Sequence, residues 1–139
     1  MEYRRFDDDV VVSLVKGEEV LSCLKEIALK ENIVLANING LGATDDFTAG
    51  LLNTTTKEYL NKRFTGDHEI VSLTGSINTM NGEYYSHLHI ACANEKNEVV
   101  GGHLNNCVIS GVGEIFIHII HGKVDREYNE EIGLNVFKF

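Results

Sequence analysis

Two histidines separated by a single residue, His87-Leu88-His89, are the strongest chemical signal in the sequence. The residues around them predict a β-strand. On a strand, positions i and i+2 point to the same face, about 6.5 to 7 Å apart at Cα. Both imidazoles can then bind one ion, because metal–nitrogen bonds of about 2.0 to 2.1 Å are within reach of the two side chains. We expect Leu88 to point into the opposite layer.

A third histidine follows in Gly101-Gly102-His103, after a polar turn at Asn94–Asn97. Its segment should return antiparallel beside the histidine pair. A four-residue loop would place His103 on the wrong face. A five-residue loop instead pairs Ala93 with Val99, and His103 then lies across from His89. A β-bulge at the two glycines would correct the face equally well.

Together these three histidines predict a site for one transition-metal ion per chain. Three nitrogen ligands leave a fourth position for water or substrate, which is typical of catalytic rather than structural zinc. Zinc is the first choice, and iron, nickel, manganese and copper are alternatives. The competing interpretation is three separate histidines with structural or surface roles. Their grouping on one predicted hairpin favours the metal.

Two glutamates, Glu69 and Glu114, are candidate catalytic groups beside the ion. A carboxylate can orient a ligand histidine or activate metal-bound water. Glu114 stands in an otherwise apolar strand and would need a partner to offset its burial. The alternative for both is a purely structural pairing. Other polar residues that could support the site are Tyr85, Asn105, Asn106 and Arg126.

The remaining histidines and the cysteines carry weaker signals. We expect core packing or a surface hydrogen bond for His118 and His121, and no chemistry for His68. Cysteines occur in an odd number without paired spacing, which predicts free, buried thiols in a reducing compartment. The three cysteines are Cys23, Cys92 and Cys107.

The elements that must position these residues follow from hydrophobic periodicity. Apolar residues recur at helical spacing from Lys16 to Glu31, which predicts one main amphipathic helix. Short turns separate the later segments and predict antiparallel hairpins, with a turn at Gly111–Gly113. The last strand should pair into the sheet. The predicted strands are 10–15, 33–38, 46–52, 69–78, 84–93, 98–104, 114–121 and 134–139, with a short helical turn at 55–60.

Composition places the chain among globular proteins of one domain, residues 1–139. Its apolar share is 43% and its charged share 24%, without a long polar tract. The net charge of −9 makes nucleic acid a poor default partner. The weak basic cluster, Lys57, Lys62 and Arg63, is typical of a solvated surface. No membrane span or signal peptide is visible, and we expect a cytoplasmic protein.

Several motifs in order resemble the PPC domain family, also called DUF296, the plants-and-prokaryotes conserved domain. The resemblance covers nearly the whole chain. It implies an α/β (α+β) fold with a mixed, largely antiparallel sheet flanked by helices, and a homotrimer. It also implies that His87, His89 and His103 match the metal-binding histidines of prokaryotic members. The motifs are Lys16-Gly17-Glu18, Asn39–Ala43, Glu69–Ser76, His87-Leu88-His89, Gly101-Gly102-His103, Glu114, Arg126 and Gly133-Leu134.

The family is often given a DNA-binding label, by analogy with plant proteins that join this domain to an AT-hook. This chain has no AT-hook and is strongly acidic, so the label does not transfer with the fold. We therefore expect a metal-dependent enzyme or small-molecule-binding protein of unspecified substrate. The alternatives are a DNA-associated regulatory module with a structural metal, and a scaffold whose function is trimerisation.

Overall fold

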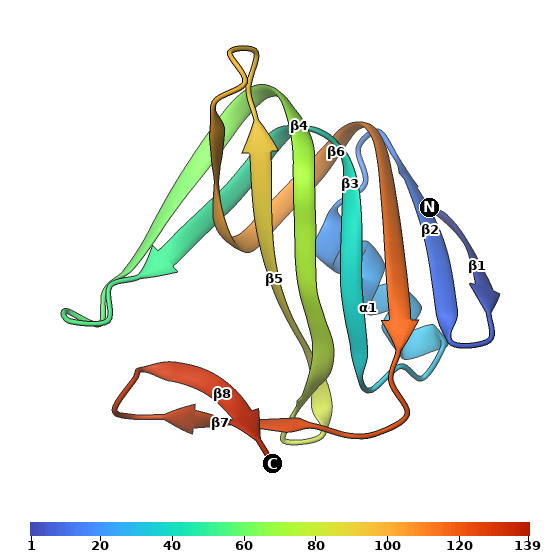
Figure 1. Cartoon of the computed structure of the whole chain (residues 1–139), viewed down its shortest axis with the longest axis vertical. Coiled ribbons are helices and arrows are strands. Elements are labelled where there is room, and N and C mark those ends of the chain that lie inside the picture. The colour runs from blue at the N-terminus through green and yellow to red at the C-terminus, as the bar shows by residue number, and fades with distance from the viewer.

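Eight β-strands and one α-helix make up the structure, a computed structural model that describes residues 1–139. Every strand pairing is antiparallel, so the parallel component expected of a mixed sheet is absent. Figure 1 shows how these elements are arranged. In chain order they are β1 (Glu2–Phe6), β2 (Asp9–Val15), α1 (Val20–Lys30), β3 (Ala36–Leu52), β4 (Tyr59–Met80), β5 (Glu83–Ala93), β6 (Val99–Ile119), β7 (Asp125–Asn129) and β8 (Leu134–Lys138).

A six-stranded sheet in the order β1-β2-β6-β3-β4-β5 forms the body of the molecule. Strand β5 pairs with β6 as well as with β4, so the four long strands β3 to β6 close on one another at one end. In Figure 1, strands β3, β4 and β6 curve over at the top of the view to make this closure. The closure brings β5 and β6 side by side where the three histidines lie.

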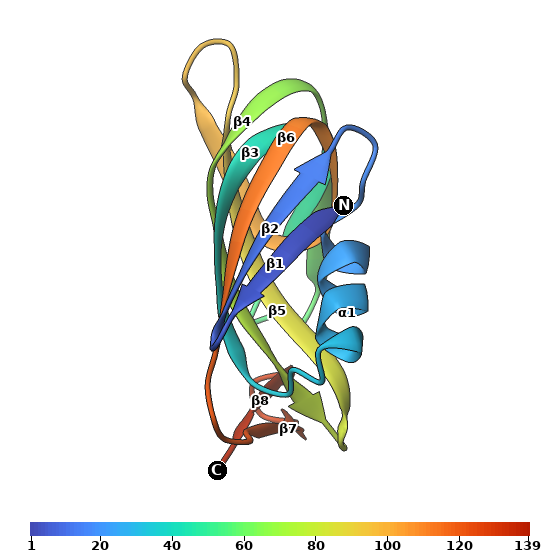
Figure 2. The ribbon, with the colours of Figure 1, turned by 90° about the vertical axis from the view of Figure 1, so that its right-hand side faces the viewer.

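Helix α1 covers one face of the sheet, and no helix covers the other face (Figure 2). The Glu19 carboxylate caps the helix by accepting hydrogen bonds from the backbone N–H groups of Leu21 and Ser22, which satisfies donors that a helix start leaves free. No helix here is both long enough and apolar enough to cross a membrane. The buried face of the helix, which packs on the sheet, consists of Val20, Leu24, Ile27 and Ala28.

The predicted helix and most predicted strands are present, but several glycines continue strands where we expected turns. Segments 98–104 and 114–121 belong to one strand, β6, and segment 46–52 belongs to β3. The turn expected at Gly111–Gly113 is therefore wrong. Gly113 pairs with Gly42 of β3 and with Leu14 of β2, and a Cβ on it would lie 2.9 Å from Ile109 Cδ1. These glycines permit close packing of strands instead of a reversal.

The C-terminal strand was also placed incorrectly by sequence pattern. β8 does not enter the main sheet and instead pairs with β7 in a separate two-stranded sheet. The hairpin of β7 and β8 lies beside the lower ends of β4 and β5 in Figure 1. Strand β7 was not predicted, and neither was β1, whose largely exposed, charged residues give no clear alternation.

The short helical turn expected at 55–60 is present only as a single turn over 53–57, closed by a hydrogen bond of 2.8 Å from the backbone N–H of Lys57 to the backbone oxygen of Asn53. Asn53 Oδ1 accepts hydrogen bonds from the backbone N–H groups of Thr55 and Thr56, which is an Asx-type turn that competes with helix formation. Lys57 then adopts a positive φ of 61°, and β4 begins at Tyr59. The turn connects β3 to β4 as a long hairpin.

Candidate metal centre

The histidine pair lies on β5, as the alternation of that strand predicts. Leu88 and Ile90 are buried in the core, so His87 and His89 point to the opposite face of the strand. His87 is half-buried and His89 is exposed. Tyr85 precedes them by one strand period and belongs to the same face. Strand β5 thus presents three ring side chains in a row.

Strand β6 brings the third histidine through the five-residue loop. Ala93 pairs with Val99, and the register continues without a shift until His103 lies across from His89. The alternative correction by a β-bulge at the glycines is not used. Gly101 instead lets β6 approach β5 closely, since a Cβ there would collide with the backbone oxygen of Ile90.

The three imidazoles converge in the folded chain. Their ring centroids are 5.2 Å apart for His87 and His89, 5.0 Å for His87 and His103, and 5.7 Å for His89 and His103. One nitrogen from each ring lies within 4.8 Å of the others. Two nitrogens on one metal are at most about 4.2 Å apart, so small side-chain rotations suffice to place all three on one ion.

Burial favours the neutral form of two of these rings, His87 and His103. Burial, with smaller contributions from His103, Arg126 and His89, lowers the pKa of His87 to about 4. Burial, and next the nearby His89, also lowers the pKa of His103. A neutral imidazole has a free lone pair, which is the form that binds metal. The centre is therefore prepared for a cation at neutral pH.

Arg126 of β7 connects the C-terminal hairpin to the histidines. Its Nε donates to Asn78 Oδ1 at 3.1 Å and its Nη1 donates to the backbone oxygen of Asn135 at 2.7 Å. Its Nη2 lies 3.5 Å from His87 Nδ1. One side chain thus joins β4, β5, β7 and β8 beside the candidate metal centre.

Arg126 as a residue is only 5% exposed, and its guanidinium forms no salt bridge. Two aromatic rings enclose it, with Tyr85 at 4.8 Å and Phe137 at 4.3 Å from ring centroid to Cζ. Such cation–π contacts partly compensate for lost hydration. Burial lowers the pKa of Arg126, yet the residue stays charged in the neutral range.

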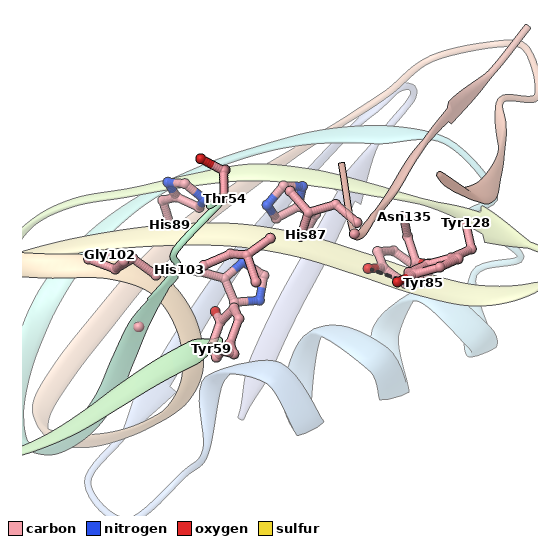
Figure 3. A pocket seen from close by; sticks show the side chains of 14 residues that line it. Thr54, Tyr59, Tyr85, His87, His89, Gly102, His103, Tyr128 and Asn135 are labelled. Atoms are coloured by element: carbon pink, nitrogen blue, oxygen red, sulfur yellow. Dashed lines mark hydrogen bonds between the residues drawn. The ribbon is translucent and has the colours of Figure 1, made fainter. Parts of the chain in front are cut away.

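A cavity of about 530 Å³ opens onto the three histidines (Figure 3). Its walls come from the ends of β3 and β4, from β5 and β6, and from the β7–β8 hairpin. No acidic side chain, lysine or arginine lines it. The lining residues are Gly50, Leu51, Leu52, Thr54, Tyr59, Tyr85, His87, His89, Gly102, His103, Tyr128, Gly133, Leu134 and Asn135.

The two predicted catalytic glutamates lie outside this cavity. Glu69 is exposed and pairs with Ala93, at the far end of the β5–β6 hairpin from His87. Glu114 pairs with Ser13 and Leu41 in the body of the sheet. It is exposed rather than buried in the single chain. Within one chain, neither carboxylate is brought to the histidines.

The other predicted polar residues divide into two groups. Tyr85 and Arg126 adjoin the histidines, as described. Asn105 donates to Asn61 Oδ1 and to the backbone oxygen of His103, so it adjoins the cavity without lining it, whereas Asn106 pairs with Thr48.

The histidines outside the centre have local contacts. His118 Nδ1 lies 2.9 Å from Asp9 Oδ1 and His121 Nε2 lies 2.7 Å from Asp8 Oδ1, which confirms surface hydrogen bonds for both. His68 contacts the Gly66 oxygen and the ring of Phe47. None of the three joins the histidine cluster.

Sequence reasoning missed most of the cavity wall. Two of the missed residues lie around the β3–β4 connection: Thr54 is in the turn and Tyr59 begins β4. The other two, Tyr128 and Asn135, lie on β7, which was not predicted, and on β8, which was misplaced. The one available signal was Gly133-Leu134, which stood among the family motifs and lies on the wall.

Comparisons with known proteins identify relatives of this fold. A model of the Plants and Prokaryotes Conserved (PCC) domain matches residues 1–121. No curated protein matches the chain. A crystal structure from Bacteroides thetaiotaomicron, named a "putative dna binding protein", is 32% identical, with a TM-score of 0.96 over 99% of this chain and 96% of that chain.

Two archaeal structures are also similar over nearly their full lengths. The plant- and prokaryote-conserved (PPC) protein of Pyrococcus horikoshii is 30% identical, with a TM-score of 0.86 over 99% of this chain and 94% of that chain. A metal-containing protein of Archaeoglobus fulgidus is 24% identical, with a TM-score of 0.89 over 99% of this chain and 97% of that chain. The architecture is therefore shared by proteins of divergent sequence.

Proposed function

The chain belongs to the Plants and Prokaryotes Conserved (PCC) domain family, and from that premise we propose that it is a metal-binding protein. One transition-metal ion, with zinc as the first choice, binds His87, His89 and His103. The observation that carries the proposal is the convergence of three imidazole nitrogens within 4.8 Å of one another. The metal-containing relative from Archaeoglobus fulgidus agrees with it.

In this proposal the ion serves a small molecule in the adjoining cavity. Three protein ligands leave one coordination position open, and the cavity begins at those ligands. A metal in such a site polarises a bound ligand or water. The protein is then a small-molecule-binding protein or a metal-dependent enzyme. A catalytic role for Glu69 or Glu114 stays a prediction, and it requires those carboxylates to act at the site of another chain.

Metal content tests the proposal directly. Protein purified without added metal, and again after incubation with zinc and desalting, should contain about one ion per chain by elemental analysis. His87→Ala and His103→Ala should reduce that content several-fold. His118→Ala is the matched control, because His118 is an exposed histidine outside the cluster, and it should leave the content unchanged. Equal metal in wild-type protein and His87→Ala would refute the proposal.

A DNA-associated regulatory function is the second candidate, favoured by the name of the relative from Bacteroides thetaiotaomicron. The charge of −9 opposes it. The weak basic cluster is also partly occupied, since Arg63 forms a bidentate contact with Asp46 and Lys57 donates to the backbone oxygen of Ile132. Phosphate contacts weaken steeply with salt. Absence of duplex binding at low salt would exclude this function.

We further propose that the assembly is a homotrimer and that the protein acts in the cytoplasm. The sheet face without a helix exposes Val11, Leu41 and Phe116, and apolar residues on such a face are typical of a subunit interface. The three cysteines form no disulfide bonds, in agreement with a reducing compartment.

A further inference from the structure

The charge around the cavity is positive once a metal is bound, although the protein as a whole is acidic. Three neutral imidazoles leave the full charge of a divalent ion uncompensated. No aspartate or glutamate lines the cavity, so the chain itself supplies no anion there. Buried charges in proteins are usually paired with an opposite charge, and a bound divalent cation is often the largest local charge in its site. Because no acidic residue of the chain balances the ion, we expect the bound ligand to supply the negative charge.

Arg126 adds a second cation to the same region. Its guanidinium is buried, has no carboxylate partner and lies beside His87. An isolated buried charge is costly unless it is paired. The hydrogen bonds to Asn78 and Asn135 hold the group in place without neutralising it. An anion at the metal would be attracted by both charges at short range.

The rest of the cavity wall is aromatic and apolar. Tyr59 packs edge-on against His103, with 5.9 Å between ring centroids. Tyr85 and Tyr128 lie at the other end of the cavity, next to Asn135 (Figure 3). Leu51, Leu52 and Leu134 complete the apolar surface. Flat aromatic faces and a volume of about 530 Å³ suit a small molecule with a planar apolar body.

We propose that the cavity binds small-molecule carboxylates that carry a flat apolar body. The carboxylate occupies the open position of the metal, and the body lies against Tyr59, Tyr85 and Tyr128. This inference rests on the metal centre proposed above. A cationic ligand would be repelled by the ion and Arg126, and a neutral one would leave their charge unbalanced.

Ligand charge tests the proposal on the wild-type protein. Zinc-loaded chain is titrated by calorimetry with benzoate, with benzamide as the neutral molecule of the same shape, and with acetate as a carboxylate without the apolar body. Benzoate should bind at least about tenfold more tightly than either of the others. Zinc-free protein should lose this preference. Benzamide or acetate binding as tightly as benzoate would overturn the proposal.

The test separates this inference from the metal site itself. Zinc uptake without selective benzoate binding removes the carboxylate inference and leaves the metal-binding function standing, whereas absence of zinc uptake removes both. Arg126→Gln should weaken benzoate several-fold when both proteins are compared at saturating zinc, because the anion loses the attraction of the buried guanidinium. Arg126→Lys, which keeps the charge, should restore part of the benzoate affinity. An unchanged benzoate affinity in Arg126→Gln would contradict the role assigned to the guanidinium.

Discussion

The three histidines have unequal surroundings, and this inequality shapes the chemistry of the centre. All three line the cavity, but His87 and His103 are half-buried and His89 is exposed. Burial holds the first two in place and keeps them neutral, so they form the fixed part of a metal site. The exposed ring can adjust as the ion enters.

Metal retention at acidic pH should follow from the lowered pKa values. Binding requires neutral imidazoles, and an ordinary histidine becomes protonated below about pH 6.5. Because burial lowers the pKa of His87 to about 4 and also lowers that of His103, protons compete with zinc at these two rings only below the ordinary histidine range. Zinc should remain bound at about pH 5.5. The measurement is zinc content after dialysis at stepwise lower pH.

The pH at which zinc is lost shows whether burial protects His87 and His103 from protonation. Loss of half the zinc at or above the ordinary histidine pKa would show that burial does not protect the rings. His121→Ala should give the same profile as wild type, because His121 pairs with Asp8 at the surface.

At the residue scale, the sequence was sufficient to place the histidines and insufficient to place their surroundings. His87 and His89 are one strand period apart, and the five-residue loop then determines the face of His103. No comparable rule places Tyr128 and Tyr85 on the wall of one cavity, because that depends on how distant elements pack. The glutamates were selected by chemical type alone, and their exposure could not be read from an apolar neighbourhood.

At the element scale, β6 is the strand on which the centre depends. It pairs with β5 near His103 and with β3 and β2 along the rest of its length. Gly101 and Gly102 let its first part fit between two neighbours, since a Cβ on Gly102 would lie 2.6 Å from the backbone oxygen of Gly50. A side chain at Gly101 would push β6 away from β5, and one at Gly102 would push it away from β3.

Gly101→Ala should therefore destabilise the chain and weaken the metal site. The added Cβ meets the backbone oxygen of Ile90, and overpacking of this kind costs about 1–3 kcal/mol. Gly111→Ala on the same strand is the control, because its Cβ would be 3.4 Å from Ala43 Cβ, an ordinary contact. Urea unfolding and zinc content measure both effects. Equal stability of the two variants would contradict the close approach of β5 and β6.

Glycine was also the main source of error in predicting elements from sequence. Gly111 and Gly113 are of the residue type that favours turns, yet both lie within strand β6. The correct assignment depends on Gly42 and Leu14 being adjacent across the sheet, which is a tertiary relation. The helix was predictable because its apolar periodicity and its backbone hydrogen bonds are local in sequence.

The β7–β8 hairpin should be separable from the core but necessary for the cavity. None of its residues belongs to the hydrophobic core cluster, whereas Tyr128, Leu134 and Asn135 line the cavity. A chain ending at Lys123 should unfold cooperatively and bind zinc, while its benzoate affinity falls about tenfold or more. Urea unfolding, elemental analysis and calorimetry provide the three readouts. Loss of cooperative unfolding would show that the hairpin is structural.

At the scale of the whole molecule, the fold closes on itself at one end and leaves a sheet face open. The β5–β6 hairpin follows from a local turn, whereas the pairing of β3 with both β4 and β6, which completes the closure, joins segments far apart in sequence and has no local pattern. The open face follows from having one helix for a sheet with two faces (Figure 2). Cross-strand pairs run along this face from Val11 through Phe116 and Asn39 to Thr74 and His89.

The open face is where the proposed trimer can be tested. Phe116 is 55% exposed at its centre, so burial against another subunit would be favourable and a charge there would oppose association. Light scattering should give wild-type protein three times the 15.5 kDa of one chain, and Phe116→Glu a smaller mass with its fold intact. Leu29→Glu is the control, since Leu29 is 59% exposed on α1, on the helix side. A monomeric wild type, or a Phe116→Glu variant of unchanged mass, would show that this face does not hold subunits together. A trimer that dissociates in the Phe116→Glu variant would instead place the subunit interface on the same sheet face as His89.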